Sequence, residues 1–186
     1  MAGVILSRLD KLRRNWAVRC LKAEGVAVGA NPYIKSRVQV SYGPNIKIGD
    51  RVRLGGGIIL SCAPQGSIQI GHDVLINDYS IINSASGVIL EDWVTIAPFC
   101  QIVDGDHGIE DLERPVREQH ENDVHAPVHI KRDVWLGSHV VVLRGVTIGA
   151  GAVIGAGSIV TKDIPDGAIA VGVPAKVVAW RGRKGA

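Results

Sequence analysis

Residues 130–160 read IKRDVWLGSHVVVLRGVTIGAGAVIGAGSIV, and an aliphatic residue returns at every sixth position: Ile130, Leu136, Val142, Ile148, Ile154 and Val160. Several of them are followed at once by glycine, which adopts turn conformations that are closed to residues with a side chain. Four positions after each aliphatic comes a second, often smaller, candidate for the interior, such as Val134 or Ala152. Two inward residues in every six, with a turn between them, indicate a short strand followed by a corner.

The same register extends toward the N-terminus. Nine more aliphatic positions keep it, namely Ile48, Leu54, Leu60, Ile70, Ile76, Ile82, Leu90, Ile96 and Ile102. Extra residues interrupt it only after multiples of three repeats: four before Ile70, two before Leu90 and twenty-two before Ile130. Three repeats therefore form one coil of eighteen residues in a triangular prism, and the extra residues bulge from corners. Val28, Ile34 and Val40 keep the step as well, so a sixth, less regular coil is expected to begin the prism.

Composition agrees with this interpretation. Val and Ile fill 46 of 186 positions and Gly fills 23, while only eight residues are aromatic, which favours strands and tight turns. A β-sandwich is the alternative, but sandwiches place turn signals every 8 to 12 residues, and this register is tighter and longer. We predict an all-β chain, folded as a parallel β-helix of hexapeptide repeats.

Three segments are expected. Residues 1–24 predict an amphipathic helix in which Leu6, Leu9, Leu12 and Trp16 recur at three- and four-residue spacing. The helix either caps the open end of the prism or contacts an anionic membrane surface, and the two roles are compatible. Residues 25–178 form the β-helix domain, which contains a long loop at 104–128. Residues 179–186 form a basic tail.

Charge and cysteine content exclude several classes of protein. The net charge of +3 comes from basic ends, since residues 1–24 and 176–186 carry +4 each and the remaining residues carry −5. A nucleic-acid-binding core would gather Lys and Arg on a folded surface, so none is expected. Cys20, Cys62 and Cys100 are odd in number and far apart, which argues against disulfides and a thiolate zinc site. The chain lacks an apolar run long enough for a membrane span or signal peptide, so we expect a cytoplasmic protein.

Residues 130–178, ending in GAGSIVTKDIPDGAIAVGVPAKVV, resemble the C-terminal half of the hexapeptide-repeat acetyltransferases, the group that includes galactoside, maltose and capsular-sugar O-acetyltransferases. The resemblance covers roughly residues 28–180. It implies a left-handed β-helix, which departs from the usual right-handed crossover. It also implies acetyl-CoA as cosubstrate and a homotrimer whose active sites lie between prisms.

The loop at 104–128 is the candidate for chemistry. It holds eight acidic and two basic residues and three of the six histidines, and polar loops of this length in compact folds are often functional. A histidine near its ordinary pKa can take a proton from a hydroxyl at neutral pH. His107 lies five residues after Ile102, between Gly105 and Gly108, where the family's catalytic histidine sits. The alternative interpretation is that His107 is a solvated loop histidine with no catalytic role.

The acceptor side is less well marked. Asn77 matches the family's asparagine that hydrogen-bonds the acceptor, although an asparagine also suits a corner. The family's acidic acceptor contact on the next coil falls at Ala85, which puts the identity of the acceptor in doubt. Asn83 is a candidate substitute.

On the donor side the resemblance places Trp135 beside the active histidine, Ser138 and Ala156 along the pantetheine channel, and Thr161 and Lys162 near the nucleotide. Small residues let an extended pantetheine approach backbone amides. Arg181, in the basic C-terminus, is a candidate for neutralising the phosphates of coenzyme A. Each of these residues also suits a corner, a prism surface or a solvated tail.

These observations predict a coenzyme-A-dependent O-acetyltransferase that acts on a sugar or glycan-precursor hydroxyl, with His107 as general base and no metal. An antibiotic acceptor is an alternative within the same chemistry. A zinc hydratase of the carbonic anhydrase type would use the spaced histidines His120, His125 and His129. A third alternative is a non-catalytic scaffold.

Overall fold

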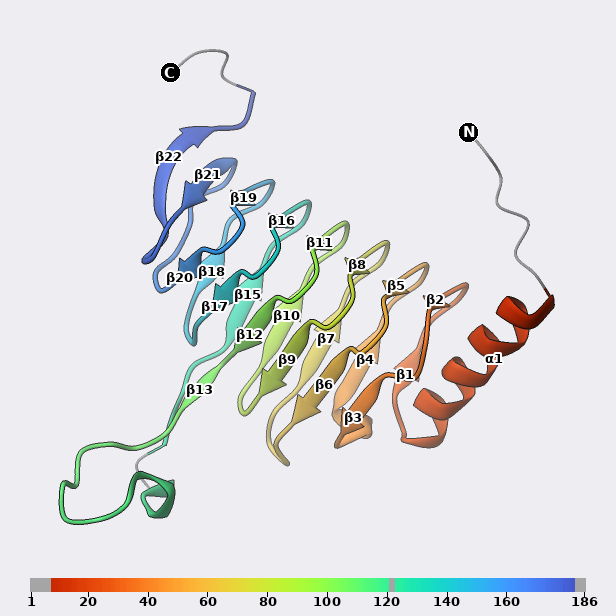
Figure 1. Cartoon of the computed structure of the whole chain (residues 1–186), viewed down its shortest axis with the longest axis horizontal. Helices are drawn as coiled ribbons and strands as arrows, with labels where there is room; N and C mark the ends of the chain where they lie inside the picture. The colour runs from red at the N-terminus through yellow and green to blue at the C-terminus, as the bar shows by residue number, and fades with distance from the viewer. Residues whose placement is uncertain (1–7, 121–122, 183–186) are drawn as a thin grey trace.

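In the computed structural model, which describes residues 8–120 and 123–182, the chain winds into a prism with three flat faces (Figure 1). Each face is a parallel sheet built from one short strand of every coil. Sheet A contains β1 (Ala27–Val28), β4 (Ile46–Ile48), β7 (Ile68–Ile70), β10 (Val88–Leu90), β15 (Val128–Ile130) and β18 (Thr147–Ile148). Sheet C contains β3 (Gln39–Ser41), β6 (Ile59–Cys62), β9 (Ile81–Ser84), β12 (Gln101–Val103), β17 (Val141–Val142) and β20 (Ile159–Val160).

Sheet B is longer because it continues past the last full coil. Its parallel strands are β2 (Tyr33–Ile34), β5 (Arg53–Leu54), β8 (Leu75–Ile76), β11 (Thr95–Ile96), β16 (Trp135–Leu136), β19 (Val153–Ile154) and β21 (Ala168–Val171). The antiparallel strand β22 (Lys176–Trp180) closes this sheet. The described strands thus form six full coils and part of a seventh. The expected left-handed parallel β-helix is confirmed.

The core consists of the residues that follow the six-residue register. All fifteen aliphatic positions predicted to face inward are buried, and so are the second positions, from Val52 through Ser158. Strand pairing follows the same register, since Ile70 lies opposite Leu90 and Leu90 opposite Ile130. The twenty-two extra residues therefore leave the prism without disturbing the stack. The predicted first coil is also present, because β1 pairs with β4.

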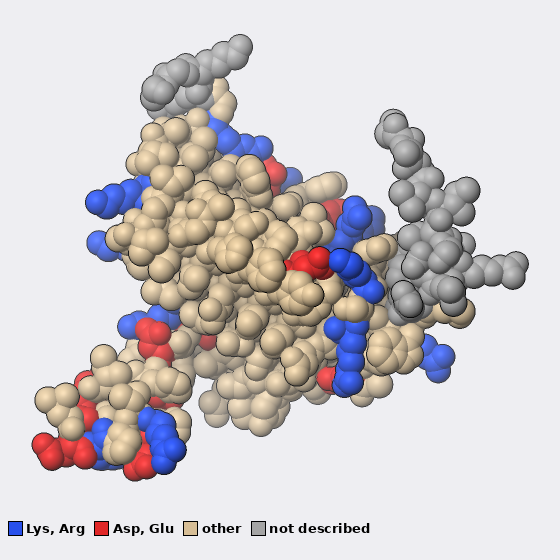
Figure 2. Space-filling model, in the orientation of Figure 1, with Lys and Arg blue, Asp and Glu red and all other residues tan. Residues whose placement is uncertain are grey.

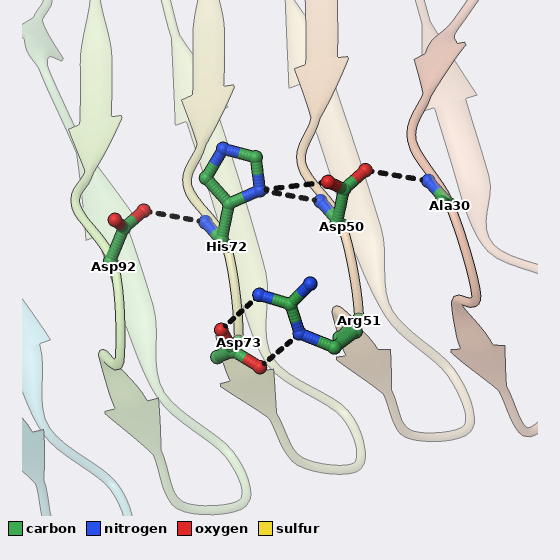
Figure 3. Close-up of polar contacts among 6 residues, drawn as sticks. All are labelled: Ala30, Asp50, Arg51, His72, Asp73 and Asp92. Carbon is green, nitrogen blue, oxygen red and sulfur yellow. Dashed lines mark hydrogen bonds and ion pairs between the residues drawn. The ribbon is translucent and has the colours of Figure 1, made fainter.

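Polar side chains link successive coils along the corner between sheets A and B (Figure 3). Asp50 accepts a hydrogen bond from the Ala30 N–H at 2.7 Å, and Asp92 accepts one from the His72 N–H at 2.7 Å. Arg51 and Asp73, both at positive φ, form a bidentate ion pair at 2.6 and 2.7 Å. The bonds to Asp50 and Asp92 satisfy corner N–H groups that have no partner within their own turn, and the Arg51–Asp73 pair joins the side chains of two successive coils.

One helix, α1 (Arg8–Ala23), covers the first coil, as expected of a cap. Its packed residues are Ala17 and Leu21, both buried, whereas Leu12 and Trp16 are 65% and 54% exposed. Leu12 and Trp16 therefore lie on a different face from the one that packs, while Leu6 and the side chain of Leu9 lie outside what the structure describes. Among the described residues, no helix has the length and apolar character needed to cross a bilayer.

Candidate functional site

A pocket of about 440 Å³ lies at the corner where sheet C turns into sheet A. Its wall comes from the ends of β6, β9 and β12, including Cys62, Asn83 and Ala85. His107 and Asp123, which belong to the excursion loop, complete the lining. The loop projects well away from the prism (Figure 1), and Figure 2 shows charged side chains crowding its surface.

A short antiparallel ladder at the base of the loop sets the position of His107. Strands β13 (Gly105–Asp106) and β14 (Val124–His125) pair Gly105 with His125 and Asp106 with Val124. The next residues on the two strands are His107 and Asp123, so the ladder brings them face to face. The Arg144 Nε of the following coil donates to Asp106 at 2.5 Å, which ties the base of the loop to the prism.

Asp123 receives polar contacts from three sides. The Gly108 N–H donates to its Oδ1 at 2.9 Å, and the Nδ1 atoms of His107 and His120 each lie 3.5 Å from one of its carboxylate oxygens. The hydrogen bond from Gly108 and the contacts with both histidines hold the pKa of Asp123 below its usual range. The carboxylate is thus ionised at neutral pH and positioned to accept a hydrogen bond from Nδ1 of His107.

Asp104 anchors the point where the chain leaves the prism. Its side chain is buried and accepts hydrogen bonds from the backbone N–H groups of Ala85, Ser86 and Gly87 at 2.5, 2.9 and 2.6 Å. The Ser84 hydroxyl donates to it as well, at 2.9 Å. Burial alone would raise the pKa of this carboxyl, but the hydrogen bonds outweigh burial and hold the pKa below its usual range. The corner at 85–87 and the root of the loop are therefore locked together.

The outer part of the loop also has internal order. Gln119 is fully buried, its Nε2 donates to the carbonyls of Asp111 and Arg114 at 2.7 and 2.9 Å, and its Oε1 accepts from the Asp111 N–H at 3.0 Å. The loop includes a short 3-10 turn at Val116–Glu118. These bonds hold the segment that directly precedes His120.

The two acceptor candidates are separated. Asn83 lines the pocket with His107, and its side chain is exposed. Asn77 belongs to sheet B, and its Nδ2 donates to the Ile96 carbonyl of the next coil at 2.9 Å. Within one chain, therefore, Asn83 lies at the pocket and Asn77 serves the stacking of coils.

The donor candidates lie on other parts of the prism. Trp135 is on the outer face of sheet B, Ser138 and Ala156 lie where sheet B turns into sheet C, and Thr161 and Lys162 follow β20. Arg181 reaches the corner between sheets A and B, where its Nη1 lies 2.9 Å from Asp133. None of these six residues lines the pocket that contains His107.

The histidines of the hydratase alternative are dispersed. The His129 Nε2 lies 2.6 Å from Glu91 of the neighbouring coil, and His125 belongs to the ladder at the base of the loop. The ring centroids of His120 and His107 lie 6.1 Å apart, and His125 lines the same pocket as His107.

Asp104 and Asp123 were not identified from the sequence as candidate functional residues. In the sequence they are two of eight acidic residues in a polar loop, and no spacing distinguishes Asp123 from the others. Asp104 lies two residues after the inward Ile102, where the chain still follows the coil, and this spacing was a signal that could have identified it.

Comparison with known proteins agrees with this architecture. The model of the family "Bacterial transferase hexapeptide (six repeats)" matches residues 127–162. A probable acetyltransferase of Mycobacterium tuberculosis is 37% identical over 158 residues, which cover 85% of this chain and 49% of that protein. The galactoside O-acetyltransferase of Escherichia coli K12 is 35% identical over 158 residues, with coverage of 85% and 65%. Residues 127–162 thus match the hexapeptide-repeat family, and the chain is similar to acetyltransferases over 85% of its length.

Solved structures of hexapeptide-repeat proteins share the fold. AntD, an N-acyltransferase from Bacillus cereus, is 28% identical in a complex with dTDP-4-amino-4,6-dideoxyglucose and coenzyme A, with a TM-score of 0.77 and 90% of both chains covered. A maltose O-acetyltransferase from Clostridium difficile 630 is 25% identical with a TM-score of 0.58, over 94% and 89% of the two chains. The chain spans between half and two thirds of the length of the mycobacterial and galactoside relatives.

Proposed function

We propose that this chain is an acyltransferase that moves acetyl from acetyl-CoA to a hydroxyl of a sugar or glycan precursor, with His107 as general base. The observation that carries the proposal is the pairing of His107 Nδ1 with the ionised Asp123 at the rim of the pocket. A carboxylate at Nδ1 favours the tautomer with hydrogen on Nδ1, which leaves the lone pair of Nε2 free to accept a proton. Asp123 is thus a positioning residue.

The reaction needs one proton transfer in each direction. Nε2 takes the proton of the acceptor hydroxyl as its oxygen attacks the thioester carbonyl, and the resulting oxyanion collapses with cleavage of the C–S bond. The imidazolium then returns the proton to the departing thiolate of coenzyme A. No acyl-enzyme forms, so a cysteine nucleophile is unnecessary. Burial and the nearby Asp104 raise the pKa of the Cys62 thiol to about 11, which leaves it protonated and unreactive in the pocket.

The donor groove is proposed to come from a second copy. His107 lies at the corner between sheets C and A, whereas Ser138 and Ala156 lie at the corner between sheets B and C. The two corners are separated by the width of sheet C, so one copy does not offer both to the same ligand. A homotrimer in which the corner between sheets C and A of each copy faces the corner between sheets B and C of its neighbour would create three complete sites. Trp135, on sheet B, is assigned to the same donor groove. Thr161 and Lys162 follow β20 at the corner between sheets C and A, and Arg181 lies at the corner between sheets A and B, so they are assigned to the nucleotide and phosphates of coenzyme A. The location of the reaction is proposed as cytoplasmic.

Transfer to an amine is the second candidate. It is favoured by the structural similarity to AntD, an N-acyltransferase observed with an amino sugar nucleotide. Ala85 stands where the family places an acidic acceptor contact, and Asp104 is occupied with backbone N–H groups. The pocket therefore presents Asn83 as its side chain for recognising a polar acceptor group, and an amide side chain can serve a hydroxyl or an amine.

A thiol-release assay with acetyl-CoA tests both candidates, with sugars, nucleotide sugars, amino sugar nucleotides and hydroxylated antibiotics as acceptors. His107→Ala should lower kcat by at least about 100-fold on the active acceptor, because a positioned general base contributes about 10²- to 10⁴-fold. His72→Asn is the matched control. In the wild type, the His72 Nδ1 accepts a hydrogen bond from the Asp50 N–H, and the Oδ1 of the introduced asparagine can accept it instead. Full activity is therefore expected of this variant. Near-normal turnover by His107→Ala with an intact oligomer would remove His107 from the mechanism.

A further inference from the structure

Three side chains of the excursion loop direct ligand atoms to a common point. His107, His120 and Asp123 each offer one nitrogen or oxygen, and these atoms lie within 4.8 Å of one another. Both imidazole Nδ1 atoms are 3.5 Å from oxygens of the same carboxylate. Two imidazoles and a carboxylate form a set that zinc accepts in proteins, with water in the fourth position.

The ligand atoms lie within reach of one zinc ion. Zn–N and Zn–O bonds of about 2.0–2.2 Å place neighbouring ligand atoms of a tetrahedron roughly 3.4 Å apart. Each histidine Nδ1 lies 3.5 Å from a different oxygen of the Asp123 carboxylate, and one ligand atom from each residue falls within 4.8 Å of the others. Rotations of the exposed imidazoles bring the set to the separation that zinc requires. The side chains of His107 and His120 are 67% and 69% exposed, so an ion can reach them from solvent.

The loop holds the three ligands near one another before any ion arrives. The ladder of β13 and β14 places His107 opposite Asp123, and the Gly108 N–H fixes the carboxylate. The hydrogen bonds of Gln119 hold the residue directly before His120. A site whose ligands are already gathered loses less conformational entropy when it binds an ion.

We propose that His107, His120 and Asp123 bind Zn²⁺ reversibly, and that the bound ion switches off acyl transfer. The inhibitory part rests on the function proposed above. In the active state His107 carries its hydrogen on Nδ1, facing Asp123, and Nε2 is the base. Zinc binds the lone pair of Nδ1, so the proton on Nδ1 is released to solvent. Nε2 then takes up a proton from solvent, and the ring stays neutral. The neutral ring then has no free lone pair for the acceptor hydroxyl.

His120 makes the proposal testable, because it belongs to the zinc set and has no role in the transfer. Titration calorimetry of the full chain with ZnCl₂ should show one ion per chain. His120→Ala should weaken zinc binding at least about tenfold, as loss of a ligand predicts. The control His125→Gln removes a histidine of the same pocket that is outside the set, and it should bind zinc like the wild type. This measurement does not depend on any activity.

The second measurement is inhibition of thiol release by ZnCl₂, expressed for each variant relative to its own metal-free rate. The wild type and His125→Gln should be inhibited at the zinc concentration that saturates the site. At that concentration His120→Ala should retain its metal-free rate, and its inhibition should require at least about tenfold more zinc. Unchanged zinc binding by His120→Ala would overturn the site. Binding at one ion per chain without inhibition, or zinc-stimulated hydration of carbon dioxide, would overturn the inhibitory role.

Discussion

At the scale of single residues, a buried carboxylate determines where the excursion loop begins. Asp104 is 1% exposed and takes hydrogen bonds from three consecutive backbone N–H groups of the neighbouring coil. These groups belong to a corner with two extra residues, which has lost the regular register and needs another acceptor. Asp104 also lies three residues before His107 in the sequence. One carboxylate therefore holds both the corner at residues 85–87 and the segment that carries the proposed base.

Asp104→Asn tests this support. At pH 7 the variant should lower the free energy of unfolding by roughly 2–3 kcal/mol, because an amide presents an N–H group where backbone donors need an acceptor. The folded pKa of Asp104 lies below the unfolded value, so its contribution is present above about pH 4 and is lost as pH falls through the folded pKa.

Urea denaturation at pH 7 and pH 3 measures the change, and the difference between wild type and variant should shrink at the lower pH. Asp106→Asn is the control. Its carboxylate pairs with Arg144 at the surface, so a loss below about 1 kcal/mol is expected. Equal losses for the two variants would remove the special role of Asp104.

At the scale of strands and corners, close backbone contacts between coils decide which glycines are required. A Cβ added to Gly49 would lie 2.5 Å from the Gly71 carbonyl oxygen of the next coil. A Cβ added to Gly87 would meet its nearest neighbours at 3.7 Å. Gly49 directly follows the register residue Ile48, whereas Gly87 lies in the corner with two extra residues, and the stacking of coils leaves room for a methyl group at Gly87 alone of the two.

Gly49→Ala should therefore destabilise the prism by about 1–3 kcal/mol, since backbone atoms of two coils must separate to admit the methyl group. Gly87→Ala should have a free energy of unfolding within about 0.5 kcal/mol of the wild type, because the methyl group makes ordinary contacts at 3.7 Å and the backbone N–H still donates to Asp104. Thermal unfolding followed by circular dichroism compares the two. A larger loss for Gly87→Ala would contradict this account of the corners.

At the scale of the whole molecule, the base His107 and the pantetheine candidates Ser138 and Ala156 occupy different corners of the prism. In the proposed homotrimer, each of three equivalent sites takes His107 from one copy and Ala156 from another. The charged excursion loop, which projects well beyond the prism in Figure 1, is placed to reach a neighbour.

Mixing two inactive variants tests this division. His107→Ala lacks the base, and Ala156→Trp should block the donor groove, so each alone should be inactive. After joint unfolding and refolding in equal amounts, about one site in four should combine an intact base with an intact groove and restore about a quarter of the wild-type activity. Light scattering should report a trimer. No recovery in mixed trimers would place base and donor groove in the same copy.

Much of the fold was predictable because it is local and repeated. Ile48 and Ile148 are inward for the same reason, and the six-residue step needs no knowledge of distant contacts. The resemblance of residues 130–178 to known acetyltransferases located His107. The face of α1 that packs was not predictable from spacing, because Leu12 and Ala17 are both apolar and only the shape of the first coil selects Ala17.

The prism of hexapeptide coils and the place of the excursion could be predicted from the sequence, since both follow from a short period and its one long interruption. The candidate base came from its position in the excursion together with the resemblance to known acetyltransferases. The contacts of Asp123 and His120 with His107, and the bonds by which Asp104 holds the root of the loop, became visible in the folded chain alone. The fold also separated Asn83, at the pocket, from Asn77, which bonds the next coil. The physical reason is that these contacts join residues 13 to 19 positions apart through a ladder and a corner whose geometry no periodicity encodes.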